Sequence, residues 1–277
     1  MLGELRDRLA IAMPHVAVVR LRGTIGSRLD PSRYERFFPA LTRLPTTRGV
    51  VLEWDSAGGG VTASEELRVA VQRLAEVRPV VSYIAGTGAS GAYLAAVAAP
   101  KVVALPTAVV GSIGVLSMRP VMTELLRKVG VSFQVTKSGP LKDMGAFYRE
   151  ATPEERQKEE ELVGEFFDDF VAWVAKARKL PEDEVRKLAS GEVFTGRRAV
   201  ELGLVDELGD RRRAVEVAAE MAGVPARAVE LSPRRSLLEQ LNPAAFAADV
   251  ARTVGAAFAR GFVDEIQENS GPGRLRS

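Results

Sequence analysis

The sequence contains no cysteine and only one histidine among its 277 residues. The absence of cysteine excludes thiol catalysis, disulfide bonds and cysteine-ligated zinc. With His15 alone, a multi-histidine metal site is impossible, and a Ser-His-Asp triad would have to use this residue. His15 precedes an apolar run that predicts a β-strand, a position typical of a structural or solvated histidine. We therefore predict a site without metal and without cofactor.

Lysine is also scarce, with eight lysines against 30 arginines. Arginine is effectively never deprotonated, so a cationic side chain that serves as a base would be one of these few lysines. The net charge of +2 is small, and no basic run or basic stripe with aromatics indicates a nucleic-acid partner. No window holds 18 uncharged apolar residues, and residues 2–13 lack the apolar core of a signal peptide. These features predict a soluble chain that is cytoplasmic or peripherally associated with a membrane.

Strands and helices alternate along most of the chain. β-rich runs at residues 16–21, 49–54 and 79–84 are each followed by a turn and a segment with helical spacing, and a further strand is predicted at 133–137. This alternation predicts an α/β fold with a mostly parallel sheet. Capping-box patterns that begin at Thr62 and Thr152 predict helix starts.

We divide the chain into four parts on composition and pattern. They are an N-terminal helical segment (1–14), a main α/β domain (15–232), a C-terminal helical extension (233–268) and a disordered tail (269–277). The C-terminal extension is rich in alanine and phenylalanine. It could pack on an oligomer, contact a membrane surface or occupy the cleft of a neighbour.

One candidate nucleophile lies in a glycine-rich turn at residues 86–91, between a predicted strand and a predicted helix. Ser90 is flanked there by small residues, so its hydroxyl can stand exposed beside backbone N–H groups. Acyl transfer needs this combination of a nucleophile and donors for a developing oxyanion. The alternative is that glycine and serine only allow the turn to pack tightly, and the motif alone leaves both interpretations open.

Two further segments follow strands in the same way. Residues 55–60 read Asp-Ser-Ala-Gly-Gly-Gly, which lets the backbone approach a substrate and lacks the Gly-Lys-Ser/Thr ending of a phosphate-binding loop. Residues 137–143 contain Lys137 and Lys142 in a predicted loop. A lysine that acts as a base must lose its proton near neutral pH, although lysine ordinarily titrates near about 10.4. Most lysines are solvated surface charges, which is the competing interpretation of both.

Five ordered blocks together resemble the signal peptide peptidase A family, the Ser–Lys peptidases of bacterial membranes, in its short form. The match extends over roughly residues 15–210 and implies a ClpP/crotonase-like spiral of ββα units with a helical C-terminal extension. The blocks are the glycine block (55–59), the nucleophile block (89–93), a Gly-Ser-Ile-Gly turn (110–115), the lysine block (137–143) and a downstream signature (193–209).

The resemblance implies a role for each matching residue. Ser90 attacks the scissile carbonyl, and Lys142, the second lysine of its block, is the general base. Ser112 orients the lysine amine, and the backbone N–H groups of Gly59 and Gly91 form the oxyanion hole. The function implied is that of a serine endopeptidase acting on signal peptide remnants or other short apolar peptides.

The short members of the family build each site from neighbouring protomers in a ring. The resemblance therefore implies a homo-oligomer whose serine and lysine come from different copies. The chain departs from the family where Asp55 replaces asparagine and Ala57 replaces proline, which puts the geometry of the glycine loop in question. The membrane anchor common in the family is not found in this sequence.

Two other functions remain as alternatives. A crotonase-type acyl-CoA enzyme would share the fold and the paired N–H groups without needing a Ser–Lys pair. A catalytically inactive homologue could serve as a membrane-associated scaffold, which the intact Ser90, Lys142 and Ser112 argue against. A ClpP-type Ser-His-Asp peptidase is excluded because that family places its histidine after the nucleophile, and no histidine follows residue 15.

Overall fold

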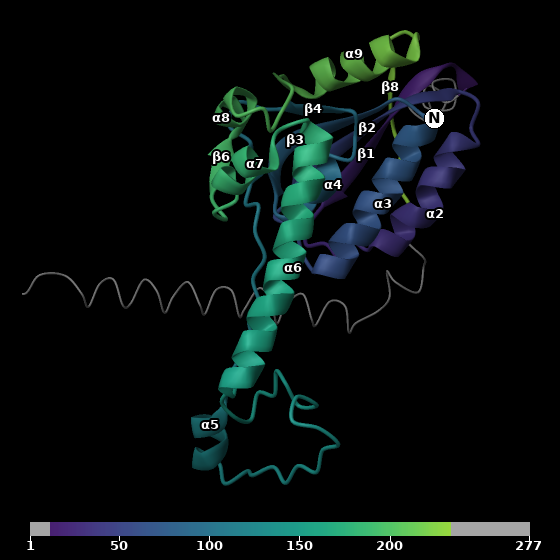
Figure 1. Cartoon of the computed structure of the whole chain (residues 1–277). Helices are drawn as coiled ribbons and strands as arrows, with labels where there is room; N and C mark the ends of the chain where they lie inside the picture. Colours follow the sequence, from purple (N-terminus) through teal and green to yellow (C-terminus); the bar gives the residue numbers. More distant parts are fainter. Residues whose placement is uncertain (1–11, 234–277) are drawn as a thin grey trace, which may run out of the picture. The chain divides into compact units, whose positions relative to one another are not determined.

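The apolar runs of the sequence form one sheet of eight strands in the computed structural model, which describes residues 12–233 (Figure 1). The order is β6-β5-β3-β2-β1-β8, and β4 pairs with β3 and β7. Every pairing is parallel except that of β5 with β6. The strands are β1 (His15–Arg22), β2 (Thr47–Ser56), β3 (Val80–Ala89), β4 (Lys101–Ala104), β5 (Val109–Gly111), β6 (Val193–Thr195), β7 (Glu207–Leu208) and β8 (Ala228–Glu230).

Helices connect the parallel strands, as crossover connections require. The helices are α2 (Pro31–Thr42), α3 (Val61–Val77), α4 (Gly91–Ala96), α5 (Thr123–Lys128), α6 (Pro153–Arg178), α7 (Glu182–Leu188), α8 (Gly196–Glu201) and α9 (Arg211–Ala222). This arrangement is the α/β fold with a mostly parallel sheet that the sequence predicts.

The two faces of the sheet have separate cores because successive strand residues point to opposite sides. In β1, Val19 and Leu21 belong to the core that also contains buried residues of α2, α3, α4 and α6. Val16 and Val18 of the same strand face α9. Burial on both faces explains why the central strands read as continuous apolar runs rather than as alternating patterns.

His15 is buried at the start of β1 and takes part in two hydrogen bonds. Its Nδ1 lies 2.9 Å from the carbonyl oxygen of Met13, and its Nε2 lies 3.1 Å from Oγ1 of Thr47. A carbonyl only accepts, so Nδ1 carries the proton and Nε2 accepts from the threonine hydroxyl. These contacts are those of a structural histidine.

Residues 112–151 leave the sheet and return to it through the long helix α6 (Figure 1). The strand predicted at residues 133–137 is not formed, so that prediction is wrong. No described strand lies beside this segment to complete a ladder, and Phe133 instead contacts the rings of Phe147 and Tyr148. Phe133 of this apolar run therefore packs in a small aromatic cluster instead of pairing in a strand.

The capping box predicted at Thr62 is also wrong, whereas the one at Thr152 is present. Helix α3 begins two residues earlier than this pattern predicts, with Gly60 as its N-cap and no side-chain cap. Thr152 accepts from the N–H of Glu155, whose side chain in turn accepts from the Thr152 N–H. The predicted N-terminal segment and C-terminal extension fall almost wholly outside the described residues. Within residues 12–233, no helix combines the length and apolarity that crossing a membrane requires.

Candidate active site

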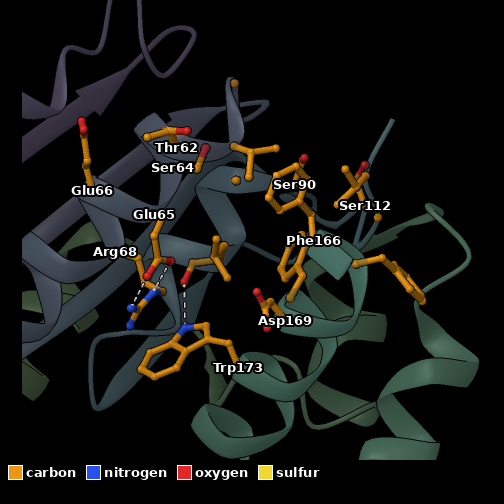
Figure 2. A pocket seen from close by; sticks show the side chains of 18 of the residues that line it. Thr62, Ser64, Glu65, Glu66, Arg68, Ser90, Ser112, Phe166, Asp169 and Trp173 are labelled. Carbon is orange, nitrogen blue, oxygen red and sulfur yellow. Dashed lines mark hydrogen bonds and ion pairs between the residues drawn. The ribbon is translucent and has the colours of Figure 1, made fainter. Parts of the chain in front are cut away.

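Ser90 occupies a sharp turn between β3 and α4. Its backbone has φ 52° and ψ −130°, a sparsely populated conformation that costs on the order of 1–3 kcal/mol. The turn is held on both sides, because the N–H of Ser90 donates to the carbonyl of Gly111 (2.8 Å) and its carbonyl accepts from the N–H of Leu94 (3.0 Å). The surrounding structure thus fixes where the serine side chain leaves the backbone, and Ser90 lines a cleft (Figure 2).

The glycine loop, residues 57–60, lies across this turn and is pinned to Ile25. The N–H of Ile25 donates to the carbonyl of Gly58 (2.9 Å), and the N–H of Gly60 donates to the carbonyl of Ile25 (3.4 Å). A Cβ on Gly59 would lie 2.0 Å from the Ile25 carbonyl oxygen. Only glycine permits this approach of two backbones.

The two positions where the glycine block departs from the family have clear local contacts. Asp55 accepts a hydrogen bond from the N–H of Thr87 (3.2 Å), which ties the end of β2 to β3. Ala57 lacks the ring of a proline, but the adjacent Ser56 hydroxyl accepts from the N–H of Gly58 (3.1 Å). A side-chain turn of this kind restrains the loop in place of proline.

Two backbone N–H groups beside Ser90, those of Gly59 and Gly91, have no acceptor among residues 12–233. They lie close together, since a Cβ placed on Gly91 would be 3.6 Å from the Gly59 nitrogen. The hydroxyl of Ser64 lies next to them, buried and without a partner in the described part of the chain. A nucleophile beside two unpaired donors is the arrangement that acyl transfer needs.

Ser112 follows β5 in the way that Ser90 follows β3. The two strands are parallel and pair Ala89 with Gly111, so the serines stand at the same level of neighbouring strands. Ser112 also has a positive φ, 50°, and its N–H donates to the carbonyl of Glu192 (2.7 Å). Both serines line the cleft (Figure 2). The structure thus brings together four of the five predicted site residues.

The cleft has a volume of about 1440 Å³ and is walled by α3, α4 and α6. Its aromatic side comes from α6, which the sequence did not predict as part of the site, although the spacing of its aromatics by three and four residues gives the signal. Trp173 is fixed there, because its Nε1 donates to the carbonyl of Leu94 (3.3 Å) and the Arg68 guanidinium lies 4.0 Å from its ring centre. The aromatic residues are Phe166, Phe167, Phe170 and Trp173.

Lys142 does not line this cleft. It is exposed in the lysine loop, residues 137–151, which is attached to the first turn of α6 where Arg149 bonds Glu155. The cleft begins on this helix only at Phe166, about 16 Å further along the axis at 1.5 Å per residue. Within one chain, the lysine loop is therefore held at the first turn of α6, away from the turns that line the cleft.

The lysine loop carries a dense set of charges. Asp143, next to Lys142, accepts from Lys137 (2.7 Å), from two nitrogens of Arg149 (2.7 and 3.0 Å) and from the hydroxyl of Tyr148 (3.0 Å). The hydrogen bonds from Arg149, and then that from Lys137, hold the pKa of the Asp143 carboxyl well below its ordinary value. Arg149 likewise lowers the pKa of Glu155 to about 2.

Charged side chains also line the cleft, among them Glu65, Asp169 and Lys176. Residues 12–233 contain no group of three or more histidine, aspartate or glutamate side chains arranged to hold a metal ion. The lysine that does line the cleft is Lys176, beside the ring of Trp173 at 5.7 Å from its centre.

The segment that carries the Ser90 turn and the lysine loop matches a known family of enzymes. Peptidase family S49 matches residues 72–225, which is more than half of the chain. The chain belongs to peptidase family S49. It is therefore a serine peptidase, and the resemblance to the signal peptide peptidase A family is confirmed.

Curated relatives come from distant organisms. The chain is 39% identical over 197 residues to slr0021 of Synechocystis sp., a match that covers 71% of this chain and 68% of that protein. It is 36% identical over 180 residues to Protease 4 of Salmonella typhi, covering 64% of this chain and 29% of that protein. The chloroplastic serine protease SPPA of Arabidopsis thaliana is 28% identical over 276 residues, covering 96% and 40%. The match thus spans about two thirds of slr0021 and less than half of the other two.

Solved structures agree on the fold. A mutant of the 1510-N membrane-bound stomatin-specific protease, in complex with a substrate peptide, has a TM-score of 0.51 and 16% identity, covering 86% of this chain and 99% of that chain. A mutant of ClpP1 from Listeria monocytogenes also has a TM-score of 0.51, with 14% identity and coverage of 76% and 98%. At such low identity these structures establish the ClpP-like fold alone.

Proposed function

We propose that the protein is a Ser–Lys endopeptidase in which Ser90 is the nucleophile and Lys142 of a neighbouring copy is the general base. The observation that carries the proposal is the Ser90 turn, where a strained serine faces a cleft beside the unpaired N–H groups of Gly59 and Gly91. Buried N–H groups are normally paired, and the fold gives no structural reason to leave these two unpaired. The oxyanion of a tetrahedral intermediate would accept a hydrogen bond from each of them.

The reaction follows from this arrangement. Neutral Lys142 takes the proton of the Ser90 hydroxyl as its oxygen attacks the substrate carbonyl, and Gly59 and Gly91 donate to the resulting oxyanion. The intermediate collapses, the ammonium returns the proton to the leaving amine, and an acyl-serine remains. A water molecule activated by the same lysine then releases the second product. The proposed role of Ser112, which follows its strand at the same level as Ser90, is to hydrogen-bond the lysine amine and orient it.

The contacts of Lys137, in the same loop, and of Lys176, in the cleft, favour Lys142 over these two as the base. Lys137 donates to Asp143 (2.7 Å), and a carboxylate partner stabilises the charged ammonium rather than the neutral amine. Lys176 lies beside Trp173, and a ring face likewise favours the cation. The side chain of Lys142 makes no hydrogen bond or ion pair with the described residues, and it adjoins Asp143, whose charge is already compensated.

A second copy of this chain is the proposed source of the lysine. The segment that carries it, residues 112–151, exposes large apolar side chains without covering them by the described part of its own chain. Exposing such apolar side chains to water costs free energy, and a patch of them is typical of a protein–protein interface. A head-to-tail contact that repeats around a ring would bring the lysine loop of one copy to the cleft of the next. The most exposed of these residues are Leu116, Met118, Leu125 and Val129, at 78%, 88%, 56% and 63%.

Short apolar peptides are the proposed substrates, among them signal peptide remnants. The aromatic wall of α6 and Leu94 offers apolar contacts next to Ser90. The cleft volume of about 1440 Å³ exceeds that of a typical small-molecule pocket, and the strained serine lines it.

Complementation between two inactive variants tests the proposal most directly. We expect Ser90→Ala and Lys142→Ala each to abolish cleavage of an apolar fluorogenic peptide while the oligomer stays intact. Co-expressed in equal amounts with different tags, they should recover about one quarter of wild-type activity per site, because one interface in four would pair an intact serine with an intact lysine. Lys187→Ala, an exposed lysine on α7 outside residues 112–151, is the matched control and should be fully active.

Each outcome has a definite meaning. If the mixed oligomers are inactive although both single variants assemble, the site is not shared in this way. If Lys142→Ala alone keeps the wild-type rate, the base is another residue and Lys137 is examined next. If wild-type protein cleaves no peptide and instead binds coenzyme A, the acyl-CoA alternative replaces the peptidase.

A further inference from the structure

Asp143 lies next to the proposed base, Lys142, in the lysine block, and its carboxylate can affect the protonation of that lysine. A bare Asp143 beside Lys142 would stabilise the ammonium form and so oppose its use as a base. In the structure, both oxygens of Asp143 are occupied by donors from Lys137, Tyr148 and Arg149. The carboxylate is therefore turned toward these groups and its charge is compensated.

Arg149 connects this compensated carboxylate to the scaffold. One guanidinium reaches Asp143 through Nε and Nη2 (3.0 and 2.7 Å) and Glu155 through Nη1 (2.8 Å). Glu155 is buried, with 1% of its surface exposed, and closes the capping box of α6 with Thr152. A bidentate guanidinium between two carboxylates fixes both direction and distance. The lysine loop is thereby attached to the first turn of α6.

Aromatic packing completes the attachment. The ring of Tyr148 stacks on Phe133 with centres 4.9 Å apart, and its hydroxyl donates to Asp143 (3.0 Å). Phe147 contacts both rings edge-on. The loop therefore has a defined shape in a single chain, before any second copy is present.

We propose that Arg149 is a positioning residue for Lys142: it keeps the Asp143 carboxylate engaged and anchors the lysine loop to α6. This inference rests on the proposed function of Lys142. The charged and titratable groups that face Asp143 are Lys137, Tyr148 and Arg149 from the loop, with Glu155 contributing from α6 through Arg149.

The test is the pH dependence of kcat/KM on the assembled wild-type enzyme and its variants. Arg149→Gln should free Asp143 to pair with Lys142, so the acid limb should move to higher pH by about 0.5–1 unit, less than a buried pair would give. The acid limb moves to higher pH because only the neutral amine of Lys142 is active, and an ammonium beside a carboxylate keeps its proton to higher pH. Adding Asp143→Asn to Arg149→Gln should return the limb to its wild-type position.

Arg156→Gln is the matched control. Arg156 also lies at the start of α6 and donates to the carbonyl of Ala151 (3.0 Å), but no hydrogen bond joins it to Asp143. Its acid limb should not move. If Arg149→Gln does not assemble, Lys137→Met serves in its place, because Lys137 also donates to Asp143. The acid limb of Lys137→Met should move to higher pH, by less than that of Arg149→Gln.

The outcomes separate this inference from the proposed function. If Lys142→Ala is inactive and Arg149→Gln lowers the rate with no change in the acid limb, Arg149 is structural only and the inference fails. The same conclusion holds if the double variant keeps the shifted limb. If Lys142→Ala retains wild-type activity, the proposed function itself has failed.

Discussion

A single methyl group added to the glycine loop tests how strictly the oxyanion donors are placed. In Gly59→Ala the new Cβ would lie 2.0 Å from the Ile25 carbonyl oxygen, where ordinary contacts begin at 3.4 Å. Both sides of this contact are backbone, so the loop must move away by about 1.4 Å to reach an ordinary contact, and a displacement of about 1 Å can already cost on the order of 100-fold in rate. The Gly59 N–H moves with the loop, and we expect kcat to fall by about this factor.

Stability should fall together with the rate. Two hydrogen bonds join the loop to Ile25, and their stretching should lower the free energy of unfolding by about 1–3 kcal/mol. We would measure initial rates on a fluorogenic apolar peptide at a temperature where circular dichroism shows both proteins folded. Sedimentation would confirm that the variant still assembles.

The neighbouring glycine supplies a matched control. A Cβ on Gly60 would meet nothing within 4 Å, so Gly60→Ala should keep a kcat close to that of the wild type, with a small loss of stability as the N-cap of α3. Equal rates for the Gly59 and Gly60 variants would refute the reasoning. They would mean that the close approach to Ile25 does not determine the catalytic geometry.

Three further substitutions have definite expected outcomes. Ser64→Ala removes a buried hydroxyl that has no partner among the described residues, so thermal unfolding should show a gain of about 1 kcal/mol, and a loss would reveal a hidden partner. Tyr93→Phe removes the bond to the Leu204 carbonyl (2.8 Å), which leaves a buried acceptor unpaired, so urea unfolding should show a loss of about 1–3 kcal/mol, and no change would mean that water replaces the hydroxyl. The pKa of Glu155 is lowered from its ordinary value to about 2, so its bond to Arg149 stabilises the fold above about pH 4.5 and loses that effect as pH falls toward 2. Arg149→Gln should therefore unfold more easily than wild type at pH 7, and the difference should shrink as pH falls from about 4.5 toward 2, so a constant difference in denaturant midpoint over this range would contradict the assignment.

Much of the cleft could be predicted because its residues follow strands directly. Ser90 and Ser112 come immediately after β3 and β5, and a parallel pairing places the ends of such strands side by side. The glycine loop follows β2 in the same way. Local sequence thus determines which segments meet at this edge of the sheet. The aromatic wall of α6 was not predicted because it lies in the middle of a helix, away from any strand end, and helical spacing alone does not show that a face borders a cleft.

The position of Lys142 could not be obtained from the sequence. The block that contains it follows an apolar run that predicts a strand, yet residues 133–137 have no strand partner within the described chain. Strand formation depends on a neighbour that a single sequence does not reveal. That the base and its nucleophile come from different copies was implied only by the family resemblance and does not follow from the residues themselves.

The two capping-box patterns show the same limit on a smaller scale. Both Thr62 and Thr152 are followed three residues later by glutamate. At Thr152 the chain is free to form the reciprocal bonds, whereas near Thr62 the contacts of the glycine loop with Ile25 start the helix at Val61. A tertiary contact therefore overrode a local signal that was equally good in both places.

Helix α6 has one further consequence if the proposed assembly holds. Its later turns wall the cleft of their own copy, while its first turn anchors the lysine that serves the next copy. One rigid element of 26 residues would then belong to two catalytic centres at once. A peptide that displaces the helix in one cleft would shift the base of the adjacent one, so neighbouring centres would sense each other's occupancy. Peptide hydrolysis would then depend on substrate concentration in a sigmoidal or biphasic way rather than hyperbolically.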